Sequence, residues 1–395
     1  DPANDFTCLG QAPQSTIERV NKFKNCGVLQ MQKTVRALAV FLFALASASA
    51  FSPVGRGSHV LSGFGRLFAV RSKMAEDRDS GVNRSSAMAS APRSSDLATR
   101  LQDVPRLGLG MAALGRPGYI NLGHGDDLKS KDVDSMRAAA HAVLDEAYAL
   151  GIRYIDCARS YGLSEEFVAT WLASKPEDVA ASMVIGSKWG YEYTAGWRVN
   201  VEAGEAHEVK KHTVAQHERQ LGETRELLGS RLHLYQIHSA TEASGVLEAE
   251  DVLGVLAKLR DEGVAVGAST SHPQVRPLAM ATAAVSEGER PIFASVQATF
   301  NLLDQSAGPV LQAAAAQGVF VIIKEALANG RLTSRNVGSA ALDLLGAEAT
   351  KLNTTPDALA LAWVLSQPWV GMCLSGASTC EQLRSNAEAL RLAPL

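Results

Sequence analysis

The chain has 395 residues, of which 46% are hydrophobic and 20% are charged, so it can bury a large core in one large domain or in two ordinary ones. The formal net charge of −3 excludes the strongly basic balance of nucleic-acid-binding proteins, and we expect no nucleic-acid partner. The cysteines are odd in number and lack C-x-x-C spacing, which predicts neither a disulfide framework nor a zinc site and favours a reducing compartment. They are Cys8, Cys26, Cys157, Cys373 and Cys380.

The first hundred residues do not read as part of a folded domain. Residues 1–30 precede the first methionine, Met31, and show no sustained periodicity, so we interpret them as upstream or non-native sequence. Residues 31–50 have the order of a secretory signal peptide: a short basic segment, an apolar run from Ala37 to Ala46, and the A-x-A pattern Ala48-Ser49-Ala50. The apolar run is too short to span a bilayer.

Phe51 follows this cleavage pattern directly, and residues 51–75 contain four Arg or Lys and no Asp or Glu. A signal peptide, then Ala-Phe, then a basic stretch resembles the two-part plastid presequence of diatoms and related algae. The resemblance implies a disordered, transit peptide-like segment over residues 51–100 and a location in the plastid (the algal chloroplast). A plain secretory signal followed by a disordered linker is the alternative, with a secreted or endomembrane location. We expect no membrane contact in the mature form.

From Val104 onward, short apolar runs alternate with segments of helical periodicity. The apolar runs predict strands at 107–111, 153–156, 183–187, 232–237, 264–268, 292–297, 319–323 and 370–374. The periodic segments predict helices near 134–150, 164–173, 213–229, 249–262, 274–286, 308–317, 337–351, 356–367 and 379–391. Eight such units within residues 101–395 predict an α/β fold, a (β/α)8 TIM barrel, with a doubly wound open sheet as the alternative.

One glycine motif points to a different kind of site. Gly108, Gly110 and Ala113 match G-x-G-x-x-A, a variant of the Rossmann dinucleotide fingerprint. That motif should open a helix, but a loop-like run rich in glycine and containing Pro117 follows. We therefore expect these glycines to let the backbone turn at the barrel mouth.

Four titratable side chains lie at the ends of predicted strands. They are Asp156 and Tyr161 in YIDCARSYG, Lys188 in IGSKWG, and His238 in LYQIH. In a parallel barrel the carboxyl ends of the strands carry the active site, so these side chains are expected to meet. Asp, Tyr, Lys and His form an acid–base set suited to a carbonyl.

The chemistry assigns each of the four a role. Hydride transfer to a carbonyl leaves negative charge on its oxygen, which Tyr161 can protonate as a general acid. The ammonium of Lys188 is expected to lower the pKa of that tyrosine, and Asp156 to serve as the counter-ion of Lys188. His238 is expected to donate a hydrogen bond that orients the substrate oxygen.

The motifs Asp-x4-Tyr-Gly, Ser-Lys-x-Gly and Tyr-Gln-x-His occur here in order, each at a strand end. In these motifs the chain from about Val104 to Ala389 resembles the aldo-keto reductases. The resemblance implies an NADP(H)-dependent oxidoreductase that transfers a hydride between the nicotinamide and an aldehyde, ketone or sugar, and a monomer or weak oligomer. A non-catalytic, dinucleotide-binding regulatory or sensor protein of the same fold is the alternative.

The resemblance also implies a set of cofactor-binding residues, because the family holds its dinucleotide without a Rossmann fold. The carboxamide would meet Ser269, Thr270 and Gln297, the phosphates Ser375, Gly376, Ala377 and Ser378, and the adenosine end Gln382 and Asn386. Phosphates commonly bind barrels in this last region, near a helix N-terminus.

Three positions depart from the family pattern. Lys324 stands where many members have an aromatic residue that stacks on the nicotinamide, so it either contacts the dinucleotide or substrate or pairs with Glu325. Thr270 replaces the usual Asn but keeps a hydroxyl. Ser378 stands where many NADP-using members carry Arg, with Arg331 or Lys324 as candidate substitutes. We predict NADPH, with NADH as the alternative.

Two further features concern the pocket and metals. Trp189, with the aromatic residues that follow it, is predicted to line the substrate pocket, with packing of the long 191–212 insertion as the alternative. His207, His212 and His217 recur every five residues, so they cannot share one helix face, and we expect no metal site.

Overall fold

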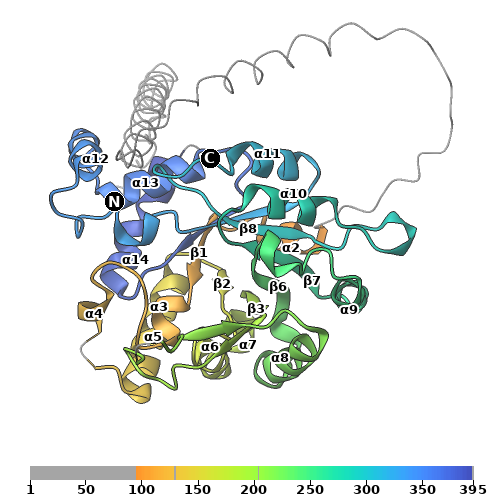
Figure 1. The fold of residues 1–395 in the computed structure, drawn as a ribbon. Helices are drawn as coiled ribbons and strands as arrows, with labels where there is room; N and C mark the ends of the chain where they lie inside the picture. Colours follow the sequence, from red (N-terminus) through yellow and green to blue (C-terminus); the bar gives the residue numbers. More distant parts are fainter. Residues whose placement is uncertain (1–94, 129, 203, 394–395) are drawn as a thin grey trace, which may run out of the picture.

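The computed structural model describes residues 95–128, 130–202 and 204–393 (Figure 1). The predicted targeting segments before residue 95 lie outside this range. Eight parallel strands close into a barrel in the order β1-β10-β9-β8-β7-β6-β3-β2, and helices surround it. The predicted (β/α)8 barrel is confirmed, and the alternative of an open sheet is wrong because β1 pairs with β10 as well as with β2.

Each barrel strand coincides with one of the predicted apolar runs. The strands are β1 (Leu107–Gly110), β2 (Tyr154–Asp156), β3 (Val184–Trp189), β6 (Leu232–Ala240), β7 (Ala265–Thr270), β8 (Ser295–Thr299), β9 (Phe320–Lys324) and β10 (Met372–Ser375). Their apolar composition follows from burial on both faces, by the barrel interior and by the helix ring.

The outer helices carry apolar side chains at helical spacing and bury them against the strands. They are α5 (Val133–Ala149), α6 (Ser164–Ala173), α8 (Val214–Leu228), α9 (Glu250–Asp261), α10 (Val275–Ala283), α11 (Gly308–Ala316), α12 (Ala340–Lys351), α13 (Pro356–Leu365) and α14 (Cys380–Ala387). Several begin at side-chain N-caps: Asp132, Thr213 and Thr379 each accept a hydrogen bond from a backbone N–H three residues on.

The structure adds short elements that the sequence did not predict. They are the helices α2 (Ser95–Leu101), α3 (Ala112–Gly115), α4 (His124–Asp127) and α7 (Glu177–Ala181), and the strands β4 (Tyr191–Tyr193) and β5 (Glu208–Lys210). The predicted helix 379–391 is divided into α14 and the short helix α15 (Ala389–Leu392). β4 and β5 pair as an antiparallel hairpin inside the 191–212 insertion.

Helix α2 closes the amino-terminal end of the barrel. Its Leu97 and Leu101 are buried against residues near the starts of the strands, including Tyr154 and Met372. The folded region therefore begins before residue 101, where the sequence placed the boundary, because these two leucines cover the barrel floor.

Gly108 does not make the predicted turn at the barrel mouth. It lies inside β1, where an added Cβ would stand 2.8 Å from Cδ1 of Tyr154. A Cβ added to Gly186 in β3 would stand 2.5 Å from the hydroxyl of the same tyrosine. The two glycines make room for the Tyr154 side chain inside the barrel.

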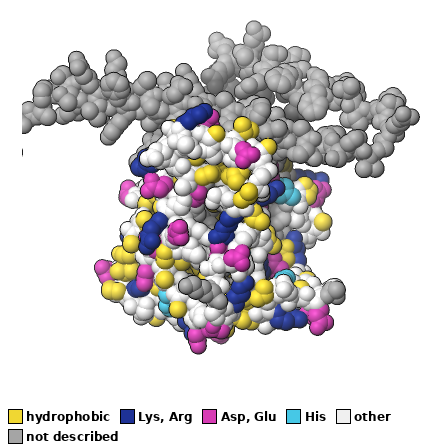
Figure 2. Space-filling view, turned by 90° about the vertical axis from the view of Figure 1, so that its left-hand side faces the viewer, with side chains coloured by type: hydrophobic (Ala, Val, Ile, Leu, Met, Phe, Trp, Pro, Cys, Tyr) yellow, Lys and Arg dark blue, Asp and Glu magenta, His cyan; other side chains and the backbone are white. Residues whose placement is uncertain are grey.

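The surface shows no dominance of one charge on the face displayed in Figure 2, where basic and acidic side chains are interspersed. Among the described residues, no helix is long and apolar enough to cross a membrane.

Candidate active site

The four predicted catalytic residues meet at the carboxyl ends of their strands. Nζ of Lys188 forms an ion pair with Asp156, donates to the carbonyl of Cys157 at 2.9 Å, and lies 3.4 Å from the hydroxyl of Tyr161. That hydroxyl lies 3.4 Å from Nε2 of His238. The phenol of Tyr161 therefore stands between an ammonium and an imidazole, as the predicted acid–base roles require.

Asp156 makes more contacts than its predicted role as the counter-ion of Lys188 requires. Its Oδ2 pairs with Lys188, while its Oδ1 accepts from Nε2 of Gln297 at 2.9 Å, from Nε2 of Gln236 at 3.3 Å and from the hydroxyl of Tyr154 at 3.3 Å. Hydrogen bonds from these three donors, together with the ion pair, offset the cost of burying the carboxylate. Asp156 thus fixes Lys188 and also orients Gln297.

His238 is held as a neutral imidazole. Burial lowers its pKa well below the ordinary value, and the charges of Lys188 and Lys324 lower it further. Its Nδ1 lies 3.2 Å from the hydroxyl of Ser160, a residue that the sequence analysis missed. A neutral imidazole carries one N–H. The contact of Nδ1 with Ser160 therefore influences whether Nε2, which faces Tyr161, carries the proton.

The pKa of Tyr161 shifts in the direction opposite to the predicted one. Burial raises it well above the ordinary value, and the carboxylates of Asp156 and Glu208 raise it further, against the lowering effect of Arg116. Burial is the largest of these causes, so the net shift of the pKa is upward despite the neighbouring ammonium of Lys188. Tyr161 is therefore a protonated donor at neutral pH.

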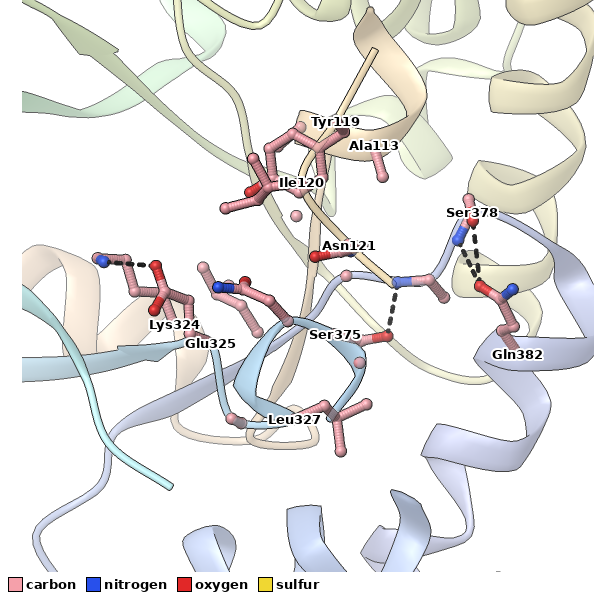
Figure 3. A pocket seen from close by; sticks show the side chains of 18 of the residues that line it. Ala113, Tyr119, Ile120, Asn121, Lys324, Glu325, Leu327, Ser375, Ser378 and Gln382 are labelled. Carbon is pink, nitrogen blue, oxygen red and sulfur yellow. Dashed lines mark hydrogen bonds and ion pairs between the residues drawn. The ribbon is translucent and has the colours of Figure 1, made fainter. Parts of the chain in front are cut away.

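A cavity of about 740 Å³ opens beside this group and runs toward α14. Most predicted cofactor residues line it: Gln297, Lys324, Ser375, Gly376, Ala377, Ser378, Gln382 and Asn386, together with Asp156, Tyr161 and His238. Figure 3 shows Lys324 and Glu325 on one side of the cavity and Ser378 and Gln382 on the other, with Tyr119, Ile120 and Asn121 beside it.

Ser269 and Thr270 lie behind the cavity wall. Both are buried in β7, and the hydroxyl of Thr270 lies 3.4 Å from the carbonyl of Gln297. Ser269 pairs in register with Gln297, and its buried Oγ has no hydrogen-bond partner. Gln297 is the one of the three predicted carboxamide residues that lines the cavity.

Trp189 is not part of the cavity lining. It is fully buried and packs edge-to-face against His212 and His217, at ring-centroid distances of 5.9 and 4.9 Å. Successive residues in a strand point to opposite faces, so a Trp189 next to an inward-facing Lys188 must face the helices. The predicted pocket position is wrong for Trp189, whereas Tyr191 does line the cavity.

Lys324 forms the internal pair with Glu325 that the sequence left open. Its ammonium lies 3.1 Å from the carboxylate of Glu325 and 3.0 Å from the hydroxyl of Thr299, so the Lys-Glu pair is internal and also lines the cavity. A second ion pair, Arg116 with Glu208 at 3.1 Å, lines the cavity beside Tyr161. Sequence reasoning missed this pair because no motif links the two residues.

The remaining lining residues fit a nicotinamide dinucleotide. Ser375 accepts from the backbone N–H of Ala377 at 3.4 Å and from Nδ2 of Asn386 at 2.8 Å, which shapes the turn between β10 and α14. This turn presents a short polar backbone segment ahead of a helix N-terminus, a setting that suits phosphate groups. No group of three or more potential metal ligands occurs among the described residues.

A closed parallel barrel with an Asp-Tyr-Lys-His group at its mouth, next to a cavity with polar and apolar lining, is typical of oxidoreductases of the TIM-barrel class. The comparison with known proteins agrees: the model of the Aldo/keto reductase family matches residues 106–395, and the chain belongs to that family.

Relatives of the chain are found among bacterial proteins. The uncharacterized oxidoreductase YqkF of Bacillus subtilis is 24% identical over 319 residues, covering 75% of this chain and 90% of its own. Pyridoxine 4-dehydrogenase of Escherichia coli is 27% identical over 295 residues, covering 74% and 91%. The holo form of aldo-keto reductase AKR11C1 from Bacillus halodurans shares the fold, with a TM-score of 0.54, 22% identity, and coverage of 74% and 88%.

Proposed function

We propose that this protein reduces the carbonyl of an aldehyde, ketone or sugar to an alcohol, with Tyr161 as the general acid. The observation that carries the proposal is the position of the Tyr161 hydroxyl at the cavity wall, 3.4 Å from Nζ of Lys188 and 3.4 Å from Nε2 of His238. A proton donor between a fixed cation and a fixed imidazole suits an oxygen that gains negative charge.

Each residue then has a defined part in the reaction. The dinucleotide, when bound, supplies the hydride that attacks the carbonyl carbon. Tyr161 is protonated and gives its proton to the carbonyl oxygen. The ammonium of Lys188 stabilises the tyrosinate that forms, so its charge acts in the transition state rather than in the resting site. Asp156 keeps that ammonium in place, and Nε2 of His238 orients the oxygen.

We infer a small polar substrate from the charges around Tyr161. The ion pairs Arg116–Glu208 and Lys324–Glu325 both line the cavity there. Such pairs offer donors and acceptors to hydroxyl groups and offer little to an apolar molecule. The name of the relative pyridoxine 4-dehydrogenase, a protein acting on a small polar molecule, fits this inference.

The hydride donor is proposed to be NADPH or NADH. Gln297, which lines the cavity, would hold the carboxamide near Tyr161. The turn from Ser375 to Ser378 would hold the phosphates, and Gln382 and Asn386 would hold the far nucleoside. The family resemblance predicts NADPH.

The plastid location is also proposed. The signal peptide-like residues 31–50 and the basic residues 51–75 support it. Residues 31–100 fused to a fluorescent protein in a diatom should direct it to the plastid. Fluorescence in the medium or the endomembranes would favour the plain secretory alternative.

The test uses the full chain. Oxidation of NADPH and of NADH is followed by absorbance against a panel of aldehydes, ketones and sugars, with the variant Tyr161→Phe. Turnover should fall more than about 100-fold in this variant, because the general acid is lost. Dinucleotide binding, measured by fluorescence titration, should remain.

Tyr148→Phe, the same chemical change on helix α5 outside the cavity, serves as the matched control and should keep full activity. An active Tyr161→Phe enzyme would remove the proposed acid. Tight dinucleotide binding by the native protein without turnover of any substrate would favour the sensor alternative.

A further inference from the structure

The cavity has a chemical end and a remote end. Tyr161 and His238 lie at the first, so a hydride donor must place its nicotinamide there. The cavity continues to Ser378 and Gln382, near the start of α14 (Figure 3). A dinucleotide that follows the cavity therefore brings its second nucleoside to Ser378 and Gln382. This step rests on the proposed function.

A carboxylate from a distant part of the chain already occupies the remote end. Asp127, in α4, accepts from the hydroxyl of Ser378 at 2.6 Å and from Nε2 of Gln382 at 2.9 Å. It also forms an ion pair with Arg335. The Asp127 side chain is only 5% exposed, so this is a built contact rather than a loose surface arrangement.

The loop that carries Asp127 is fixed to the neighbouring wall. The backbone N–H of Leu122 donates to the carbonyl of Asn329 at 3.0 Å, and Arg335 donates to the carbonyl of Leu122 at 3.3 Å. Gly123 has a φ of 73°, and an added Cβ there would lie 3.1 Å from the guanidinium of Arg335. These contacts hold Asp127 over Ser378.

Asp127 is charged at neutral pH. Burial alone would raise its pKa, but the hydrogen bonds from Arg335 and Ser378 outweigh burial and hold the pKa below its ordinary value. Arg335 offsets this one charge, while further carboxylates line the remote end of the cavity. Those carboxylates are Asp126, Asp357 and Glu381.

The charge of Asp127 matters because the two common nicotinamide dinucleotides differ at a single position, on the adenosine ribose. NADPH carries a phosphate on the 2′ position of the adenosine ribose, with about two negative charges, whereas NADH has a hydroxyl there. Sites for a 2′-phosphate present cations, while an acidic side chain suits a 2′-hydroxyl, which it can bind as an acceptor.

We propose that Asp127 selects the dinucleotide by its 2′ substituent: its carboxylate accepts from the ribose hydroxyl of NADH and repels the 2′-phosphate of NADPH. The protein therefore prefers NADH, contrary to the preference predicted by resemblance. The absence of Arg at position 378 agrees with this, because Ser378 uses its hydroxyl to bind Asp127.

The test measures the dissociation constants of NADH and NADPH for the full-length protein by calorimetry or fluorescence. The native protein should bind NADH roughly tenfold more tightly than NADPH, since a like charge at contact distance is strongly unfavourable. Asp127→Asn removes the charge with little change of shape and should tighten NADPH binding about tenfold, while NADH binding changes less than about threefold. Asp127→Glu keeps the charge and should keep NADPH weak.

Asp126→Asn is the matched control. It removes the same charge from the neighbouring residue, which also lines the cavity, and should change the NADH-to-NADPH ratio less than Asp127→Asn does. Thermal melting of each variant checks that the loop change leaves the fold intact.

The outcomes separate the two proposals. A native preference for NADPH, or a ratio unchanged in Asp127→Asn, would overturn the role of Asp127 while the proposed reductase stands. If neither dinucleotide binds the native protein, both the reductase and the role of Asp127 fail.

Discussion

The hydroxyl of Ser160 lies 3.2 Å from Nδ1 of His238, at the ring nitrogen opposite the one that faces Tyr161. Ser160 is buried, and His238 is the partner that its hydroxyl contacts. If this hydroxyl donates, Nδ1 accepts and Nε2 must carry the proton. Ser160 is thus a positioning residue, which sets the tautomer that the orienting role of His238 requires.

The variant Ser160→Ala should lower turnover by about tenfold, with little change in dinucleotide affinity. The reason is that it removes only the hydrogen bond that fixes the tautomer of His238. Nitrogen-15 NMR of histidine-labelled protein distinguishes the two tautomers directly. The native protein should show the proton on Nε2, and the variant a mixture. Unchanged turnover together with an unchanged tautomer would show that Ser160 only fills space.

Removing Asp156, the counter-ion of Lys188, should lower the stability of the fold. Asp156→Asn leaves a buried ammonium without its charge partner, and the free energy of unfolding should fall by about 3–5 kcal/mol. Urea denaturation measures this fall. The double variant Asp156→Asn, Lys188→Met removes both charges and should recover most of the stability but none of the activity. If the double variant is as unstable as the single one, the lost stability comes from the other hydrogen bonds to Asp156 and not from the unpaired ammonium.

Acid should destabilise the fold through two histidines, the buried His217 and the partly buried His212. Burial, as the main cause, lowers the pKa of His212 and of His217 to about 4. The unfolded chain, with histidine pKa values near 6.5, binds more protons between about pH 4 and 6.5. Stability is therefore complete above about pH 7 and is lost as the pH falls through that window.

From pH 7 to pH 5 the buried His217 should contribute a loss of about 2 kcal/mol, and the partly exposed His212 a smaller one. Urea denaturation at the two pH values measures it. His217→Phe, which keeps a ring against Trp189, should show a clearly weaker pH dependence. The same loss in this variant would assign the effect to other groups.

The two glycine environments predict opposite effects of one added methyl group. Gly108→Ala places a Cβ 2.8 Å from the Tyr154 ring, so the free energy of unfolding should fall by about 1–3 kcal/mol. Gly254→Ala in helix α9 meets no atom within 4 Å and should raise stability by about 0.5–1 kcal/mol. Equal effects in thermal melts would contradict the packing described for Tyr154.

The sequence predicted the barrel well, because buried strands and amphipathic helices have strong periodic signals. Helix α6 begins and ends where its periodicity does, at Ser164 and Ala173. The Asp156–Lys188–Tyr161 contacts were also predicted, since barrel topology brings strand ends together. Trp189 was misplaced although strand alternation could have excluded it from the interior.

Other features have no local signal. The contact of Asp127 with Ser378 joins residues 251 positions apart, and it depends on how one loop folds across the barrel mouth. The pKa of Tyr161 likewise depends on the sum of burial and several charges, which a sequence does not give. Helix α2 was assigned to the presequence because seven residues next to a low-complexity segment show little periodicity.

Helix α2 and the cavity lie at opposite ends of the barrel. Its leucines seal the floor, while the cavity opens at the opposite rim among the carboxyl ends of the strands. A cleavage site or fusion tag placed ahead of Ser95 would therefore leave the substrate's route clear. A protein shortened to residue 102 would lose Leu97 and Leu101 and leave Tyr154 open to water from below, so the tolerated truncation point lies on the upstream side of α2.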